Sequence, residues 1–141
     1  MKKSGLRITA LWLSLMLSAW PASAAAEGRI TKAVLGTGRT DKYEIVNPTT
    51  EFQPDTAQIV CVWKSEGVKP GTPVRGVWIA EDVGSVAPPN FKIDEASSAL
   101  YVEGSFYLSK PNKGFPVGKY RLEIYLGKEL AKIVAFTVKA K

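Results

Sequence analysis

The chain of 141 residues contains no histidine and only one cysteine. Histidine is the commonest general base and metal ligand in proteins, so its absence excludes Ser-His and Cys-His nucleophile systems within this chain. The single cysteine, Cys61, cannot form an intramolecular disulfide, and zinc and copper sites lose their usual ligands. Both methionines, Met1 and Met16, lie near the start of the chain. These absences predict a protein without cofactor, metal centre or catalytic activity.

The first 26 residues have the composition of a secretory signal peptide. Lys2, Lys3 and Arg7 precede an apolar run over residues 8–20, and Pro21 and a series of small residues follow it. A basic start, an apolar segment of about 7–15 residues and an A-x-A-like site define such a signal. The run is shorter than the roughly 20 apolar residues of a spanning helix. We therefore expect cleavage near residue 26, no membrane anchor afterwards, and one exported domain over residues 27–141 that is periplasmic or secreted.

The positive charge of the chain is concentrated in that first segment. Three of the 19 Lys and Arg residues precede residue 27, whereas all 13 Asp and Glu residues follow residue 26, so the formal net charge falls from +6 to about +3. The remaining basic residues are interleaved with acidic ones. Nucleic-acid binding calls for a clustered basic stripe, so the sequence predicts no nucleic-acid partner.

Apolar and polar residues alternate with period two in several short runs, which is typical of strands. Residues 119–126 and 130–138 alternate on either side of Gly127-Lys128, which predicts a hairpin with Leu130, Val134 and Phe136 on one face. Residues 99–108 form the clearest single run, with Leu100, Val102, Phe106 and Leu108 on the apolar face. In this run Gly104 suggests a bulge or a close approach of the backbone.

Two further runs are apolar enough to be interior strands. Residues 57–64 are apolar on both faces and predict a central strand, in which Cys61 is a buried thiol. Residues 73–80 predict another, and we expect Trp63 and Trp78 to lie in the core. Residues 28–50 and a short FKID segment supply the remaining strands, whereas no stretch has helical periodicity over three turns. About seven strands separated by turns predict an all-β, antiparallel two-sheet sandwich.

The C-terminal third also resembles a known type of domain. After the Pro/Gly-rich loop at residues 109–118 comes a G-x-Y-R-x-E strand, a turn and a final F-x-V. This pattern resembles the end of immunoglobulin-like modules of bacterial envelope proteins, and the spacing of Phe52, Ile59 and Trp78 is similar as well. The resemblance covers about residues 50–140 and implies an immunoglobulin-like fold. The residues that carry the C-terminal pattern are Gly118, Tyr120, Arg121, Glu123, Phe136 and Val138.

Tyrosine and basic residues are the candidate binding residues. If residues 99–108 pair antiparallel with residues 118–126, one solvent-exposed face collects Tyr101, Tyr107, Lys119, Arg121 and Tyr125. Tyr and Arg commonly anchor protein interfaces, and aromatic rings also stack against sugars. An ordinary outer sheet face with cross-strand pairs is the alternative interpretation.

The loop at residues 109–118 extends this candidate surface. Lys113 and Phe115 lie among its turn residues, and an exposed Phe beside Lys is a plausible contact for a partner. The alternative, which we prefer, is that Phe115 folds under the hairpin and caps the core.

Carboxylate chemistry has weaker support. The pairs Glu81-Asp82 and Asp94-Glu95 are adjacent in sequence, so strand geometry points their side chains in opposite directions. A hydrolase with a carboxylate site is therefore a minor alternative. The main expectation is a non-catalytic exported binding or adaptor domain with an envelope protein as partner, and a glycan is the alternative ligand.

Overall fold

The computed structural model describes residues 28–141, which form ten strands and no helix. The predicted signal peptide lies outside the described residues. Within residues 28–141 the protein has no helix of the length and apolarity needed to cross a membrane. The strands are β1 (Arg29–Gly36), β2 (Gly38–Arg39), β3 (Ile45–Val46), β4 (Glu51–Phe52), β5 (Gln58–Glu66), β6 (Val74–Asp82), β7 (Phe91–Ser98), β8 (Glu103–Ser109), β9 (Gly118–Leu126) and β10 (Glu129–Val138).

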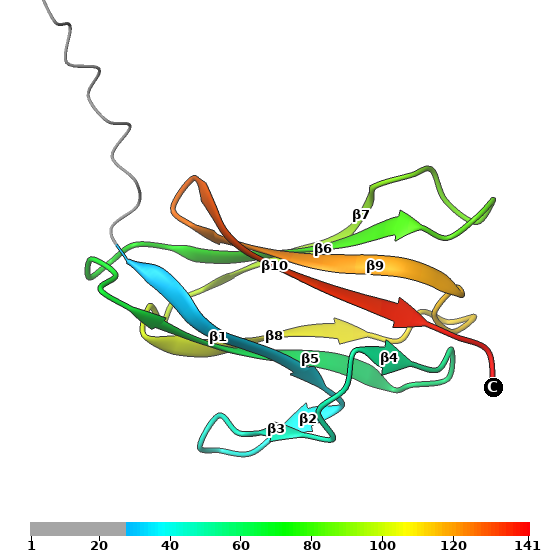
Figure 1. The fold of residues 1–141 in the computed structure, drawn as a ribbon, viewed down its shortest axis with the longest axis horizontal. Coiled ribbons are helices and arrows are strands. Elements are labelled where there is room, and N and C mark those ends of the chain that lie inside the picture. Colours follow the sequence, from blue (N-terminus) through cyan, green and yellow to red (C-terminus); the bar gives the residue numbers. More distant parts are fainter. Residues whose placement is uncertain (1–27) are drawn as a thin grey trace, which may run out of the picture.

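Two sheets face each other and enclose the core, as Figure 1 shows. One sheet has three strands in the order β1-β5-β8, and the other has five in the order β4-β10-β9-β6-β7. Apart from the two-residue parallel contact of β4 with β10, neighbouring strands in both sheets are antiparallel. The predicted all-β two-sheet sandwich is thus confirmed.

The C-terminal hairpin and the central strand follow the sequence pattern. Strands β9 and β10 pair from Leu126 and Glu129 to Gly118 and Val138, around a turn in which Gly127 has a φ of 60°. Strand β5 lies between β1 and β8, and five consecutive residues from Ile59 are fully buried. A strand covered on both faces has no need for alternation, which is why its sequence is continuously apolar.

Aromatic rings fill the space between the sheets. Trp63 and Trp78 are fully buried, as expected, and Trp63 stacks on Phe106 with ring centroids 6.0 Å apart. Two inward-facing glycines make room for these rings. A Cβ at Gly104 would lie 2.6 Å from the Trp63 ring, and a Cβ at Gly76 would lie 2.7 Å from the Phe106 ring. The expected close approach at Gly104 is therefore confirmed, and its partner is the Trp63 ring.

At the ends of two predicted strands, residues expected on the apolar face are exposed. The expected strand over residues 99–108 begins only at Glu103, and Leu100 and Val102 are about half exposed. Residues 99–102 instead carry the chain from the edge of one sheet to the edge of the other. In β10, a register shift between Leu130 and Lys132 turns Leu130 outward, so that Ala131 packs against the core in its place.

The β2–β3 hairpin covers the outer face of the three-stranded sheet, where Figure 1 shows it below β1 and β5. It folds back so closely that a Cβ at Gly36 would lie 2.3 Å from the Val46 carbonyl oxygen. This cover explains why Val60 and Val62, on the outer side of β5, have no exposed surface.

Candidate functional site

The predicted Tyr/Arg face does not exist as one surface. Strand β8 pairs with β5 in the three-stranded sheet, whereas β9 pairs with β6 and β10 in the five-stranded sheet. Tyr107 and Tyr125 therefore belong to different sheets. The pairing of residues 99–108 with residues 118–126, which this face required, does not occur because the connection between β8 and β9 crosses from one sheet to the other. Alternation places residues on a face, but it does not select the neighbouring strand.

Tyr107 is engaged with the β2–β3 hairpin. The Arg39 Nε donates a hydrogen bond of 2.6 Å to the Tyr107 hydroxyl oxygen, and the Ser105 hydroxyl lies 3.2 Å from the same oxygen. Arg39 also lies over the Tyr43 ring, 4.4 Å from its centroid. Burial alone would raise the pKa of Tyr107, but these hydrogen bonds and the Arg39 charge lower it below its usual value. Tyr107 thus ties the hairpin to the sheet beneath it.

Tyr101 occupies a different position again. It lies in the 99–102 crossing, half-buried against the core, and its carbonyl oxygen accepts a hydrogen bond from the Ser65 hydroxyl. Lys119 is exposed near the start of β9. The structure therefore does not bring Tyr101 into the same face as Lys119.

Arg121 and Tyr125 do share the outer face of the five-stranded sheet, where a network of internal contacts holds them. The Arg121 guanidinium donates to Asn90 Oδ1 at 2.7 Å and forms ion pairs of 3.1 Å with Glu81 and Glu123. The Tyr125 hydroxyl donates to Glu123 at 2.9 Å, and this hydrogen bond, with burial, raises the pKa of Tyr125.

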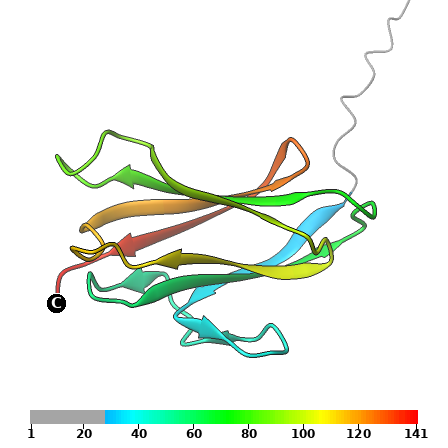
Figure 2. The ribbon, with the colours of Figure 1, turned by 180° about the vertical axis from the view of Figure 1, so that it is seen from behind.

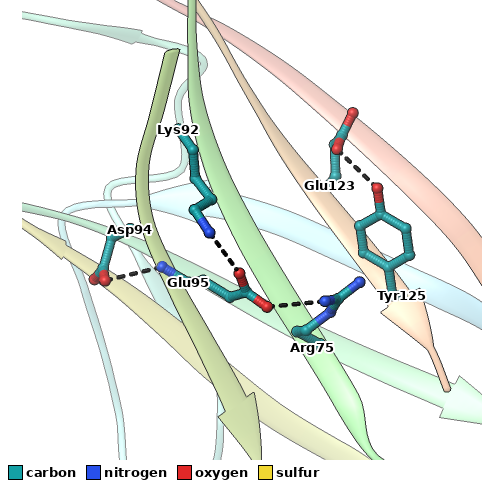
Figure 3. A network of polar contacts seen from close by, with 6 residues as sticks. All are labelled: Arg75, Lys92, Asp94, Glu95, Glu123 and Tyr125. Atoms are coloured by element: carbon teal, nitrogen blue, oxygen red, sulfur yellow. Dashed lines mark hydrogen bonds and ion pairs between the residues drawn. The ribbon is translucent and has the colours of Figure 1, made fainter. Parts of the chain in front are cut away.

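The same network continues across β6 to β7, as Figure 3 shows. Arg75 stacks on the Tyr125 ring at 4.5 Å and pairs with Glu95 at 2.9 Å, and Lys92 also reaches Glu95 at 3.1 Å. Hydrogen bonds from Lys92 and Arg75 lower the pKa of Glu95. Since these charges already have partners within the chain, the outer face is a poor candidate for a binding surface.

An apolar pocket of about 550 Å³ lies between the β6–β7 loop and the β8–β9 loop. Figure 2 shows both loops at the end of the sandwich that also holds the C-terminus. The wall formed by the β6–β7 loop and β7 includes Val86 and Phe91, which are 69% and 48% exposed. On the other loop, Lys113 and the buried Phe115 line it. Cavities of roughly 300–1,000 Å³ with mostly apolar walls are typical ligand sites.

The β8–β9 loop is held against the body of the sandwich by its backbone. The Phe115 N–H donates to the Pro54 carbonyl at 2.9 Å, and the Lys110 N–H donates to the Ala57 carbonyl at 3.0 Å. Phe115 is only 3% exposed and belongs to the core cluster, which confirms the preferred expectation that it caps the core. The binding role assigned to Lys113 and Phe115 remains a prediction, and the pocket is where it applies.

Hydrogen bonds at the two ends of the β6–β7 loop hold it in place. The Gly84 N–H donates to the Asp82 carboxylate at 3.1 Å, and the Asn90 N–H donates to the Glu81 carbonyl at 3.1 Å. Asn90 has a φ of 57°, and Arg121 holds its side chain. Phe91 follows directly, so Arg121 holds the residue next to the aromatic side chain of this wall.

Two lysines outnumber the acidic groups at the pocket rim, where Asp55 is paired with Lys141 at 3.3 Å. Lys113 lines the pocket, and Lys110 lies next to it in an adjoining depression. The ion pairs found among residues 28–141 include neither of these lysines. Two unpaired ammonium groups beside an apolar cavity favour an occupant that combines an apolar group with a negative charge.

The predicted carboxylate pairs do not converge on a shared site. Glu81 is bound to Arg121 and Asp82 to the Gly84 amide, while Asp94 accepts from the backbone N–H of Glu95. Among residues 28–141 there is no group of three or more Cys, Asp and Glu residues placed to hold a metal ion.

No protein-family model and no curated protein matches the sequence. Among solved structures, the chain is similar to an immunoglobulin-like protein from Pseudomonas aeruginosa, with a TM-score of 0.53 and 20% sequence identity. The alignment covers 82% of this chain and 99% of that one. The described chain has an immunoglobulin-like fold. At this identity the likeness concerns the fold alone.

The sequence analysis named Tyr120 but missed its hydrogen bond, which is a feature of immunoglobulin-like domains. The Tyr120 hydroxyl, near the start of β9, donates to the carbonyl of Pro116, four residues upstream. This is the tyrosine corner of immunoglobulin-like domains, in which the tyrosine stands two residues before the second cysteine of the inter-sheet disulfide. Here that position is Leu122, while Cys61 lies buried in β5. The sequence did carry a signal for this feature. A Tyr follows a Pro/Gly-rich loop and stands two residues before an apolar position.

Proposed function

We propose that this protein is a non-catalytic, exported binding domain of the bacterial cell envelope that engages a protein partner through the apolar pocket. The signal-like first 26 residues support export. The observation that carries the proposal is the exposure of Phe91 and Val86 beside the cavity of about 550 Å³. Exposed apolar patches with a polar rim mark interaction sites, and aromatic residues in partly enclosed pockets anchor protein interfaces.

The pocket favours a protein partner over a glycan. Sugar binding requires several hydrogen-bonding side chains next to an aromatic ring, and Asn112 and Lys113 are the polar side chains of this lining apart from the Tyr120 hydroxyl, which is bound to Pro116. The glycan alternative depended on the Tyr/Arg face, whose members are divided between the two sheets.

A photo-crosslinking experiment tests the proposal. A benzophenone amino acid is placed at Val86 beside the pocket and, as a matched control, at Val102, which is similarly exposed in the 99–102 crossing. Irradiation of cells is expected to give a discrete protein adduct from position 86 and none from position 102. The substitution Phe91→Ser should remove the adduct without lowering the melting temperature by more than a few degrees, because Phe91 is half exposed.

The opposite results are equally clear. Equal adducts at the two positions, or an adduct at position 86 that persists in the Phe91→Ser variant, would show that the pocket is not the contact surface. An adduct with lipid and none with protein would refute a protein partner and indicate a lipid ligand.

A further inference from the structure

The pocket continues into an unpaired sheet edge. Strand β7 is the outermost strand of the five-stranded sheet, and β6 is its strand partner within residues 28–141. Its first residues, Phe91 and Ile93, also line the pocket. An edge strand presents unpaired N–H and C=O groups that pair with an added strand.

The neighbouring edge strand of the three-stranded sheet does not combine a free edge with the pocket. Strand β8 is also an edge strand, but none of its residues lines the pocket. On β7, six of the eight residues are exposed, so its surface is open on both faces of the sheet. The free edge and the apolar cavity therefore meet only along β7 within the described chain.

The edge of β7 is only partly protected: its register with β6 shifts at Ile93, and Asp94 lies opposite the buried Trp78. Charged side chains commonly protect edge strands from pairing, but Lys92 and Glu95 neutralise each other and are anchored through Arg75 on the outer face. Asp94 remains exposed and accepts the Glu95 N–H at 2.8 Å, so an added strand has to take this N–H from Asp94 or pair on either side of it. The edge thus carries one free negative charge along the strand and two free positive charges, Lys110 and Lys113, at the pocket.

We propose that the partner presents an extended peptide segment that pairs with β7 as a sixth strand and inserts an aromatic or large aliphatic side chain between Phe91 and Phe115. The charges define its polarity: an acidic residue lies next to the inserted side chain and faces Lys113, and a basic residue further along faces Asp94. This inference rests on the proposed function and specifies its binding mode. Backbone pairing supplies affinity, and the pocket supplies specificity.

The probe for this binding mode is a displayed library of random 12-residue peptides, selected on the purified protein. The enriched peptides are expected to alternate with period two and to contain one aromatic or large aliphatic residue flanked by an acid and a base. Two N-methylated versions of an enriched peptide are then synthesised. One is methylated on the odd-numbered backbone amides and the other on the even-numbered ones, because in a paired strand only one of these sets faces β7. The set that faces β7 should weaken binding at least tenfold, and the other set should leave it nearly unchanged.

Hydrogen exchange and protein variants complete the test. Bound peptide is expected to slow amide exchange within residues 91–98, and Phe91→Ser should weaken binding at least tenfold. A charge exchange tests the contact with Lys113. Lys113→Glu should weaken binding of the peptide with the acidic residue, and replacing that acidic residue by lysine should restore the affinity of the peptide for this variant.

The results separate the binding mode from the proposed function. Peptides that need Phe91 but tolerate both N-methyl sets, with no slowing within residues 91–98, would overturn strand addition and leave pocket binding intact. A library without enriched peptides, together with a protein adduct at position 86, would do the same. Absence of a protein adduct at position 86 when Phe91 is unchanged would overturn the proposed function itself.

Discussion

Adding one methyl group at Gly76 tests the packing on which the fold depends. The Cβ of a Gly76→Ala variant would lie 2.7 Å from two carbons of the Phe106 ring, whereas ordinary contacts begin at 3.4 Å. The ring would have to retreat by about 0.7 Å into a core packed like an organic crystal. It cannot do so freely, because Phe106 is stacked on Trp63, and Trp63 lies directly against Gly104.

Overpacking of this kind costs about 1–3 kcal/mol. For a domain of this size each kcal/mol corresponds to roughly 4 °C in melting temperature. Urea unfolding followed by tryptophan fluorescence measures the change, since Trp63 and Trp78 are both buried. The matched control is Gly38→Ala, whose Cβ would meet its nearest neighbour at 3.8 Å and which we expect to change stability by less than about 0.5 kcal/mol.

A double-mutant cycle identifies the cause. Phe106→Leu removes the ring that obstructs the new methyl group, so the double variant should be more stable than the sum of the single effects predicts, by about 0.5–3 kcal/mol. Additive effects, or a Gly76→Ala variant as stable as Gly38→Ala, would refute the chain of close contacts from Gly76 through Phe106 to Trp63.

Two further predictions concern the loop and the buried ionisable groups. Arg121→Gln should speed amide exchange at Asn90 and cost about 1–2 kcal/mol, the value of charged hydrogen bonds reduced for partial exposure; unchanged exchange would contradict its positioning role. Burial raises the pKa of both Cys61 and Tyr120 to about 12, so above about pH 9 the unfolded chain loses protons that the folded chain retains. Stability should therefore be complete below about pH 8 and fall as pH rises, by roughly 1.4 kcal/mol per unit and group. Cys61→Ala should move the onset from about pH 9 to about pH 10 in denaturation curves, and an unchanged onset would contradict the raised pKa of Cys61.

The strands themselves were predictable because their signal is local. Alternation in residues 119–126 and continuous apolarity in residues 57–64 each reflect how one strand meets the core, and the structure has strands in both places. The burial of Trp63 and Trp78 follows in the same way from the apolar runs in which they lie. Local pattern also failed locally: a crossing between sheets and a register shift turned Leu100 and Leu130 outward, and neither feature has a period that the sequence displays.

The candidate site was less predictable because it depends on which strands are neighbours. Tyr107 and Tyr125 have the alternation of a shared face, yet the loop that separates β8 from β9 places them in opposite sheets. The pocket is formed by two loops and the start of β7, which are brought together by tertiary structure alone. The sequence indicated Lys113 and Phe115 as candidates, but it gave no sign that Phe91 would lie in the opposite wall.

The pocket follows from the unequal width of the two sheets. Five strands face three, and β7, the edge strand of the wider sheet, begins with exposed residues. Phe91 is consequently left 48% exposed beside a cavity whose other wall is the buried Phe115. Complete burial of a Phe side chain contributes about 1.5–3 kcal/mol, and roughly half of that is still to be gained at Phe91. An inserted apolar side chain would gain a similar amount from its own burial, so the free energy available at this edge is realised only when a second chain covers it.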